Sequence, residues 1–301
     1  MKNWKAHLAV LSANLFFGLN FSAVQYITKK WVHPFGLNVI RVGVSSILLW
    51  LMLFFVPTKA AIRKEHIGRF ILCSLTGVVI NQALFIKGLS MTLSIHASLL
   101  ILVTPIFITL VATWLGKEAL TIFKIAGLLL GIGGAVLLAL DKEHKHIEAS
   151  DILWGDIFIV INAISYAFYF VLVKPLMQAY NPVHVIRWVF LFGLLFTIPI
   201  GWSEFSSIEW QTFTWKEIAL VSFIVLGATF FAYLFNLYGI YHLGASVTGT
   251  YIYTQPVFAS IIAVLLLNET FGWQKLIAAV CIIGGVFLVS RKPRSTKLPV
   301  S

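Results

Sequence analysis

The fold is decided by two stretches of equal length: TPIFITLVATWLGKEALTIFKIAGLLLGIGG at 104–134 and QPVFASIIAVLLLNETFGWQKLIAAVCIIGG at 255–285. Each contains an apolar segment, a short polar link and a second apolar segment. The second stretch repeats key residues of the first stretch without a gap, at an interval of 151 positions. The matched residues are Pro105 and Pro256, Glu118 and Glu269, Lys124 and Lys275, Gly133 and Gly284, and Gly134 and Gly285. An internal repeat built of membrane-length segments indicates a carrier rather than an enzyme.

The composition is that of an integral membrane protein. Hydrophobic residues make up 59% of the 301 residues, only 11% are charged, and the mean hydropathy is +0.93. A soluble domain carries roughly 25% charged residues. Ten apolar segments of about 20 residues can be placed, each long enough to cross a bilayer as a helix. They cover 7–26, 35–56, 67–87, 93–115, 122–140, 152–173, 183–202, 218–240, 245–267 and 273–290.

The basic residues predict the orientation. Ten spans place both termini on one side of the membrane, and that side collects 14 of the 22 lysines and arginines. The positive-inside rule therefore predicts cytoplasmic termini in a multi-pass protein of the plasma membrane, the inner membrane of the cell. We interpret the basic tail 291–301 as a stop signal and lipid anchor rather than as a nucleic-acid site.

Five spans in each half mean that the halves enter the membrane in opposite directions. Such inverted repeats form two similar units around a pseudo-twofold axis in the membrane plane. We therefore predict an all-α membrane protein of ten transmembrane helices, arranged as a 5+5 inverted-topology repeat. Its parts are a first repeat at 1–143, a linker loop at 144–151, a second repeat at 152–290 and the tail. His144 and His146 in the linker favour a solvated loop over a metal site, since no soft ligands lie nearby.

Neutral polar side chains recur at helical spacing in six spans. In the sixth span, for example, Asn162, Tyr166 and Tyr169 fall at i, i+4 and i+7 and share one face. Polar groups that face lipid are costly, so these faces are expected to point inward. Either they bind the helices together by hydrogen bonds, or they line a central cavity that binds substrate. The candidate lining residues are Asn20, Gln82, Thr104, Asn162, Tyr166, Tyr169, Tyr233, Asn236, Tyr251 and Gln255.

Two charged or titratable residues join the candidate substrate-binding set. Arg41 lies about one turn inside its span, where it could reach the interface or a backbone carbonyl, or hold a substrate carboxylate. His96 lies within the fourth span and could couple transport to protons, or form a buried hydrogen bond. Pro105 and Pro256 lie mid-span and are predicted to kink their helices and to serve in gating.

The sequence argues against other kinds of chemistry. All eleven carboxylates are assigned to loops or helix ends, so none stands where a proton relay through the bilayer would need one. There is no metal-ligand cluster, nucleophile elbow or nucleotide-binding loop. We therefore predict no cofactor, no resident metal and no catalytic residue.

The segments Phe17–Phe21 and Ser94–Ser98, together with Pro34, Arg41 and Pro105, resemble the EamA-type carriers of the drug/metabolite transporter superfamily. So do Glu118 and the series Gly127, Gly131, Gly133 and Gly134. The likeness covers both halves and almost the whole chain. It implies a ten-helix inverted-repeat fold and export of amino acids or other small metabolites. In one departure, Gln25 stands where the family often has lysine.

The resulting expectation is a secondary transporter that moves a small polar metabolite through a cavity poor in fixed charge. Its partners are a small-molecule substrate and the lipid bilayer, not nucleic acid, and the chain is either a monomer or a homodimer. Two alternatives stay open. A channel-like facilitator needs no two-state symmetry, and a membrane-embedded enzyme needs a reactive group with a base and an orienting partner.

Overall fold

A computed structural model describes residues 4–55, 61–115, 122–139, 149–243, 251–267 and 272–290. Within these ranges the chain forms helices and no strand, which confirms the predicted all-α class. The linker histidines His144 and His146, the repeat-related pair Glu118 and Glu269, and the basic tail lie outside the described residues.

The first half runs from α1 to α7. Its α-helices are α1 (Trp4–Lys30), α2 (Pro34–Leu51), α3 (Ile67–Ser74), α4 (Ile80–Met91), α5 (Ser94–Leu100), α6 (Thr104–Trp114) and α7 (Ile122–Ala139). Short 3-10 helices cover Met52–Phe54, Lys64–His66 and Ile101–Val103. A π-helical segment, Leu75–Val79, joins α3 to α4.

The second half repeats this order. Its α-helices are α8 (Ala149–Ala179), α9 (Pro182–Ser206), α10 (Trp215–Ser222), α11 (Ala232–Leu243), α13 (Gln255–Leu267) and α14 (Trp273–Ser290). A longer π-helical segment, Phe223–Phe231, joins α10 to α11, and 3-10 helices cover Trp210–Thr212 and Tyr251–Thr254.

Local sequence signals explain several helix starts. Pro34 and Pro182 occupy the first turns of α2 and α9, where a missing backbone N–H costs nothing because that group has no partner inside the helix. The side chain of Asn181 caps α9 by accepting from the backbone N–H of Val183 at 2.9 Å. Thr214 and Glu217 form a capping box at the start of α10.

Seven helical stretches in the described residues are long and apolar enough to span a membrane. They are Trp4–Lys30, Pro34–Phe54, Lys64–Met91, Ser94–Trp114, Asp151–Ala179, Pro182–Ser206 and Trp215–Asn236. Two shorter apolar helices cover Ile122–Gly134 and Trp273–Gly285. The chain is therefore a multi-pass membrane protein, and the count of ten spans stays a prediction.

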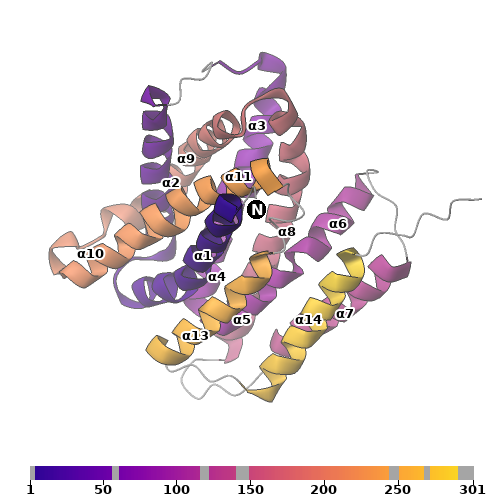
Figure 1. Ribbon diagram of the computed structural model, residues 1–301. Coiled ribbons are helices and arrows are strands. Elements are labelled where there is room, and N and C mark those ends of the chain that lie inside the picture. Colours follow the sequence, from indigo (N-terminus) through magenta and orange to yellow (C-terminus); the bar gives the residue numbers. More distant parts are fainter. Residues whose placement is uncertain are drawn as a thin grey trace, which may run out of the picture.

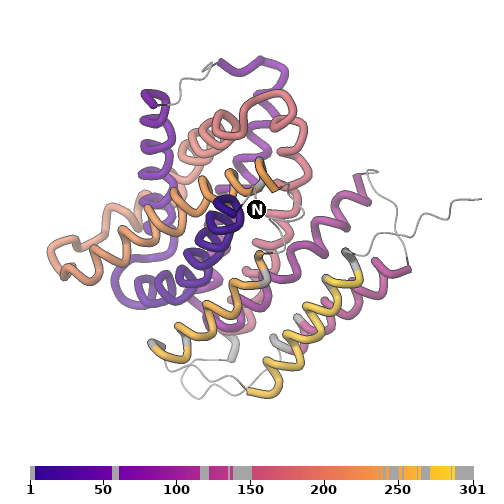
Figure 2. The backbone as a smooth tube through the Cα atoms, in the orientation of Figure 1, coloured from indigo at the N-terminus to yellow at the C-terminus, as the bar shows by residue number. Residues whose placement is uncertain are grey.

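The helix contacts repeat when the two halves are exchanged. α2 packs on its counterpart α9, and α7 packs on its counterpart α14 at one edge of the bundle (Figures 1 and 2). The contact of α1 with α11 is mirrored by that of α8 with α4, and the contact of α1 with α13 by that of α8 with α6. Each half therefore packs mainly against the other, around the centrally placed α1 and α8.

Glycines allow the closest of these approaches. A Cβ added to Gly285 of α14 would lie 2.5 Å from the carbonyl oxygen of Gly127, and one added to Gly134 of α7 would lie 2.9 Å from that of Ala278. These glycines are thus used for packing between α7 and α14 within the chain.

At Pro105 and Pro256 the structure does not show the predicted kink in the middle of one α-helix. In each case a 3-10 helix ends and a new α-helix begins. Pro105 and Pro256 are each the second residue of a new α-helix, α6 and α13, directly after the 3-10 helices Ile101–Val103 and Tyr251–Thr254. Proline cannot donate to the preceding turn and clashes with it, so the break falls one turn earlier than the proline itself.

Candidate functional site

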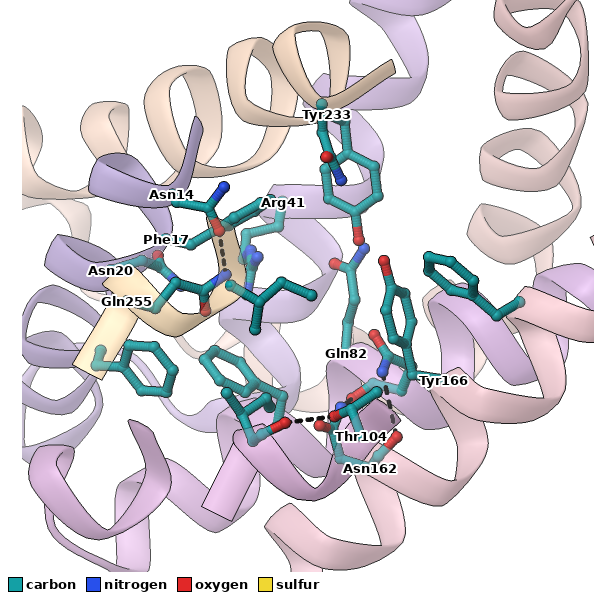
Figure 3. Close-up of a pocket in the computed structure, with 17 residues that line it drawn as sticks. Asn14, Phe17, Asn20, Arg41, Gln82, Thr104, Asn162, Tyr166, Tyr233 and Gln255 are labelled. Atoms are coloured by element: carbon teal, nitrogen blue, oxygen red, sulfur yellow. Dashed lines mark hydrogen bonds between the residues drawn. The ribbon is translucent and has the colours of Figure 1, made fainter. Parts of the chain in front are cut away.

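A cavity lies at the centre of the bundle, between α1, α2, α4, α6, α8, α11 and α13 (Figure 3). It contains about 140 Å³ open to the centres of water molecules. By this measure a cavity needs roughly 10–15 Å³ to hold one water, so this one has room for several waters or for a small molecule. Nine candidate residues from the sequence line it: Asn20, Arg41, Gln82, Thr104, Asn162, Tyr166, Tyr233, Asn236 and Gln255.

The rest of the wall lies outside the set of candidate binding residues. Asn14 and Asn81 add polar groups next to the predicted ones, on α1 and α4. The apolar part of the wall comprises Phe17, Phe21, Phe85, Ile101, Phe170 and Ile252. Large apolar residues occur throughout the spans, so nothing in their spacing separates cavity wall from core.

Three candidate residues lie outside the cavity wall. The ring of Tyr169 stacks on that of Tyr166 with centroids 5.8 Å apart, and Tyr169 is buried against Gly77. The hydroxyl of Tyr251 lies 2.7 Å from Nδ1 of His7, near the start of α1. His96 is fully buried beside Asp156.

Two amide contacts position the polar wall. Nδ2 of Asn162 on α8 donates to the backbone oxygen of Asn81 on α4 at 2.6 Å, and Nδ2 of Asn81 donates to the backbone oxygen of Asn162 at 3.3 Å. Nε2 of Gln255 on α13 donates to Oδ1 of Asn14 on α1 at 2.7 Å. Side chains held in this way lose little further entropy when a ligand binds.

Arg41 is held at the cavity by a partner from the opposite half. Its Nε donates to Oγ1 of Thr229 at 3.0 Å, and that hydroxyl donates to the oxygen of Ile224 at 2.8 Å inside the π-helical segment. Arg41 is only 4% exposed and is the one charged side chain among the described residues that line the cavity. The guanidinium is therefore anchored through Nε beside the cavity (Figure 3).

Several buried polar atoms of the wall residues lack a partner among the described residues. In the part of the chain that the structure describes, Nη1 of Arg41 and the side-chain oxygens Oδ1 of Asn20 and Asn162 have no hydrogen-bond partner. A buried polar group without a partner is costly, so such groups point to a role in binding. One cationic donor and two amide acceptors together complement a molecule that carries both an anionic and a cationic group.

The π-helical segments direct two repeat-related side chains inward. Leu75–Val79 precedes Gln82 in α4, and Phe223–Phe231 precedes Tyr233 in α11. Gln82 and Tyr233 are separated by the repeat interval of 151 residues, and their side chains point toward each other across the cavity (Figure 3). A π-helical turn inserts an extra residue and rotates the remainder of the helix, a device frequent at functional sites.

The assignment of every carboxylate to a loop or helix end is wrong for Asp156. This residue lies seven positions after the start of α8, about two turns inside the helix. It is 1% exposed, because α8 begins before the apolar segment recognised in the sequence and packs closely on α4 there.

Comparison with known proteins covers almost the whole chain. The model of the EamA-like transporter family matches residues 4–140 and again 153–291. The chain is 25% identical to the uncharacterized transporter YetK of Bacillus subtilis, over 97% of this chain and 89% of that protein. It is 27% identical to an uncharacterized transporter of Archaeoglobus fulgidus, over 96% of this chain and 99% of that protein.

A plant relative and a solved structure extend the comparison. A WAT1-related protein of Arabidopsis thaliana is 22% identical over 95% of this chain and 85% of its own length. A crystal structure of a protein with 18% sequence identity superposes with a TM-score of 0.64, covering 95% of this chain and 96% of the other. At this identity the likeness concerns the fold alone.

Proposed function

Because this chain belongs to the EamA-like transporter family, we propose that it is a secondary transporter that exports amino acids or similar small polar metabolites from the cell. The observation that supports this proposal is that the Arg41 guanidinium and the amide side chains of Asn20 and Asn162 line the same cavity, each with a buried polar atom that has no hydrogen-bond partner within the described part of the chain. The direction of export rests on the resemblance of the sequence to known carriers of this family.

The chemistry of the wall favours a zwitterion. A substrate carboxylate accepts from Nη1 of Arg41, which gives a charge-assisted hydrogen bond in surroundings of low dielectric constant. The ammonium group donates to the amide oxygens, which carry partial negative charge without the desolvation cost of a second full charge. The aromatic rings of Phe17, Phe85 and Tyr233 cover the apolar part of the molecule.

Alternating access supplies the mechanism of movement. The two repeats, at 1–143 and 152–290, rock against each other about the cavity in a plasma membrane whose cytoplasmic side holds both termini. The 3-10 breaks before Pro105 and Pro256 are the bending points, since Thr104 and Gln255 beside them line the cavity. A channel-like facilitator is the second possibility for the same cavity.

Counterflow in proteoliposomes tests this proposal. Vesicles loaded with unlabelled amino acids are diluted into a mixture of radiolabelled protein amino acids. A carrier accumulates label transiently, and the uptake saturates. Linear flux without counterflow indicates a channel, and chemically altered label indicates an enzyme. Either result contradicts the proposal.

A neighbouring pair of tyrosines provides a matched test of the cavity. Tyr166 lines the cavity, whereas Tyr169, three residues later on the same helix, does not. We expect Tyr166→Phe to weaken counterflow and Tyr169→Phe to leave it close to that of the wild type. Equal effects of the two changes would remove the cavity as the transport site.

A further inference from the structure

A second buried polar site lies at one end of the bundle, away from the cavity wall. It joins the start of α5, the turn between α4 and α5, and the second turn of α8. Nδ1 of His96 is 3.1 Å from Oδ2 of Asp156, and the hydroxyl of Thr92 donates to the other carboxylate oxygen, Oδ1. The side chains of His96 and Asp156 are 0% and 2% exposed.

The same site is linked to α1. Nε2 of Gln25 donates to the backbone oxygen of Thr92 at 2.7 Å, and Oε1 of Gln25 accepts from the hydroxyl of Ser94 at 2.8 Å. The position where the family often has a lysine is thus used here to bind the α4–α5 turn to α1. Three elements of the bundle meet at one hydrogen-bonded network.

Close backbone contact encloses this network. A Cβ added to Gly155 would lie 2.7 Å from the backbone nitrogen of Thr92 and 2.8 Å from the carbonyl oxygen of Gly88. α4 and α8 therefore touch directly beside Asp156. The other charged side chains on the elements packed here are Lys5, Lys29 and Lys30 on α1, Lys87 on α4, Lys124 on α7, Asp151 and Lys174 on α8, and Lys275 on α14.

The pair can take up one proton. A neutral imidazole beside an ionised carboxylate has a net charge of −1, and one further proton brings the net charge to zero. Two ionisable groups in contact exchange protons as one unit. Histidine is also the side chain whose charge ordinarily changes near neutral pH.

Elements that carry the network also contribute residues to the cavity wall: α1, α8 and the 3-10 helix that directly follows α5. Phe21 lies one turn before Gln25 on α1, Asn162 lies six residues after Asp156 on α8, and Ile101 lies five residues after His96. A change in the hydrogen bonds of this network therefore affects helices that also form the cavity wall. Binding at two such sites is reciprocal: if a proton changes substrate affinity, the substrate changes proton affinity by the same factor.

We propose that transport by this protein is coupled to protons, and that the His96–Asp156 pair is the site that binds the coupling proton. This inference rests on the proposed transport function. In each cycle the pair takes a proton from one aqueous side and releases it to the other as the substrate moves in the opposite direction. No covalent bond other than that to the proton forms or breaks.

The test uses the full chain in proteoliposomes with the radiolabelled amino-acid mixture. Counterflow at equal pH on both sides measures transport, and accumulation driven by an imposed pH gradient measures coupling. A pH-sensitive dye inside the vesicles reports proton movement when amino acids are added. We expect the wild type to show all three signals.

Two single substitutions test whether the His96–Asp156 pair binds the coupling proton. Asp156→Asn and His96→Gln should each lower gradient-driven accumulation by about tenfold or more, with a much smaller loss of counterflow, and abolish the dye response. Asp156→Glu should retain part of the coupling, because it keeps a titratable group. Size-exclusion profiles and thermal unfolding identify a variant that fails to fold, in which case the other variant decides.

The outcomes separate the two proposals. Wild-type counterflow that is indifferent to a pH gradient would overturn proton coupling and leave the transport function intact. Coupling that persists in both variants would overturn the assignment to His96 and Asp156. Absence of counterflow in the wild type would overturn the transport function itself, and the coupling with it.

Discussion

Replacing Arg41 with glutamine should remove the preference of the protein for a carboxylate. The wild-type side chain is anchored by the 3.0 Å bond from Nε to Thr229, which leaves Nη1 to donate to the substrate. A hydrogen bond to a charged group contributes about 1.5–3 kcal/mol. Since about 1.4 kcal/mol corresponds to a tenfold change in affinity, the loss is roughly 10- to 150-fold.

Competition binding measures this loss directly. Purified protein is incubated with the radiolabelled amino-acid mixture, and unlabelled amino acids are compared as competitors with their carboxamide derivatives, which lack the negative charge. The wild type should prefer the acids, and Arg41→Gln should bind acids and amides with similar affinity. A variant that keeps the wild-type preference would refute the role of Arg41.

Arg187 offers a matched control for this experiment. It lies on α9, the counterpart of α2, five residues after the helix start, but its Nε donates to the oxygen of Leu49 at 3.2 Å and its guanidinium lies 5.5 Å from the ring centre of Trp50. Arg187 does not line the cavity. Arg187→Gln should therefore keep the preference for acids, whatever its effect on thermal unfolding.

The remaining predictions concern packing and movement. Gly285→Val should lower the midpoint of thermal unfolding, because its Cβ would clash with Gly127 and overpacking costs about 1–3 kcal/mol. Gly133→Ala should not lower it, since nothing lies within 4 Å of the added Cβ; equal losses would contradict the packing. Pro105→Ala and Pro256→Ala should slow counterflow more than they weaken equilibrium binding, and unchanged counterflow rates would exclude these prolines from gating.

Helical periodicity predicts which face of a span is polar, and this accounts for most of the cavity. Asn162 and Tyr166 point into it, whereas Tyr169, on the same predicted face, turns toward the core beside Gly77. Asn162 contacts Asn81 of α4, whereas Tyr169, further along α8, contacts Gly77 of the π-helical segment. Periodicity contains no information on which neighbour a side chain meets at a given depth.

The His96–Asp156 contact shows a second limit of structure prediction from the sequence. The two residues are 60 positions apart and lie on different helices. Asp156 stands close to the start of an apolar segment, so hydropathy places it at a helix end. Its burial results from the close approach of Gly88 and Gly155, a contact between α4 and α8 that only the three-dimensional packing reveals.

Alternating access requires that one cavity opens in turn to the two sides of the membrane. Asn20→Cys, in a chain whose Cys73 and Cys281 are replaced by alanine, places a single thiol in the cavity wall. A membrane-impermeant thiol reagent is then applied to sealed vesicles from outside, or from inside after loading. We predict labelling from either side, slowed in both cases by the amino-acid mixture; labelling from only one side, or from neither, would contradict alternating access.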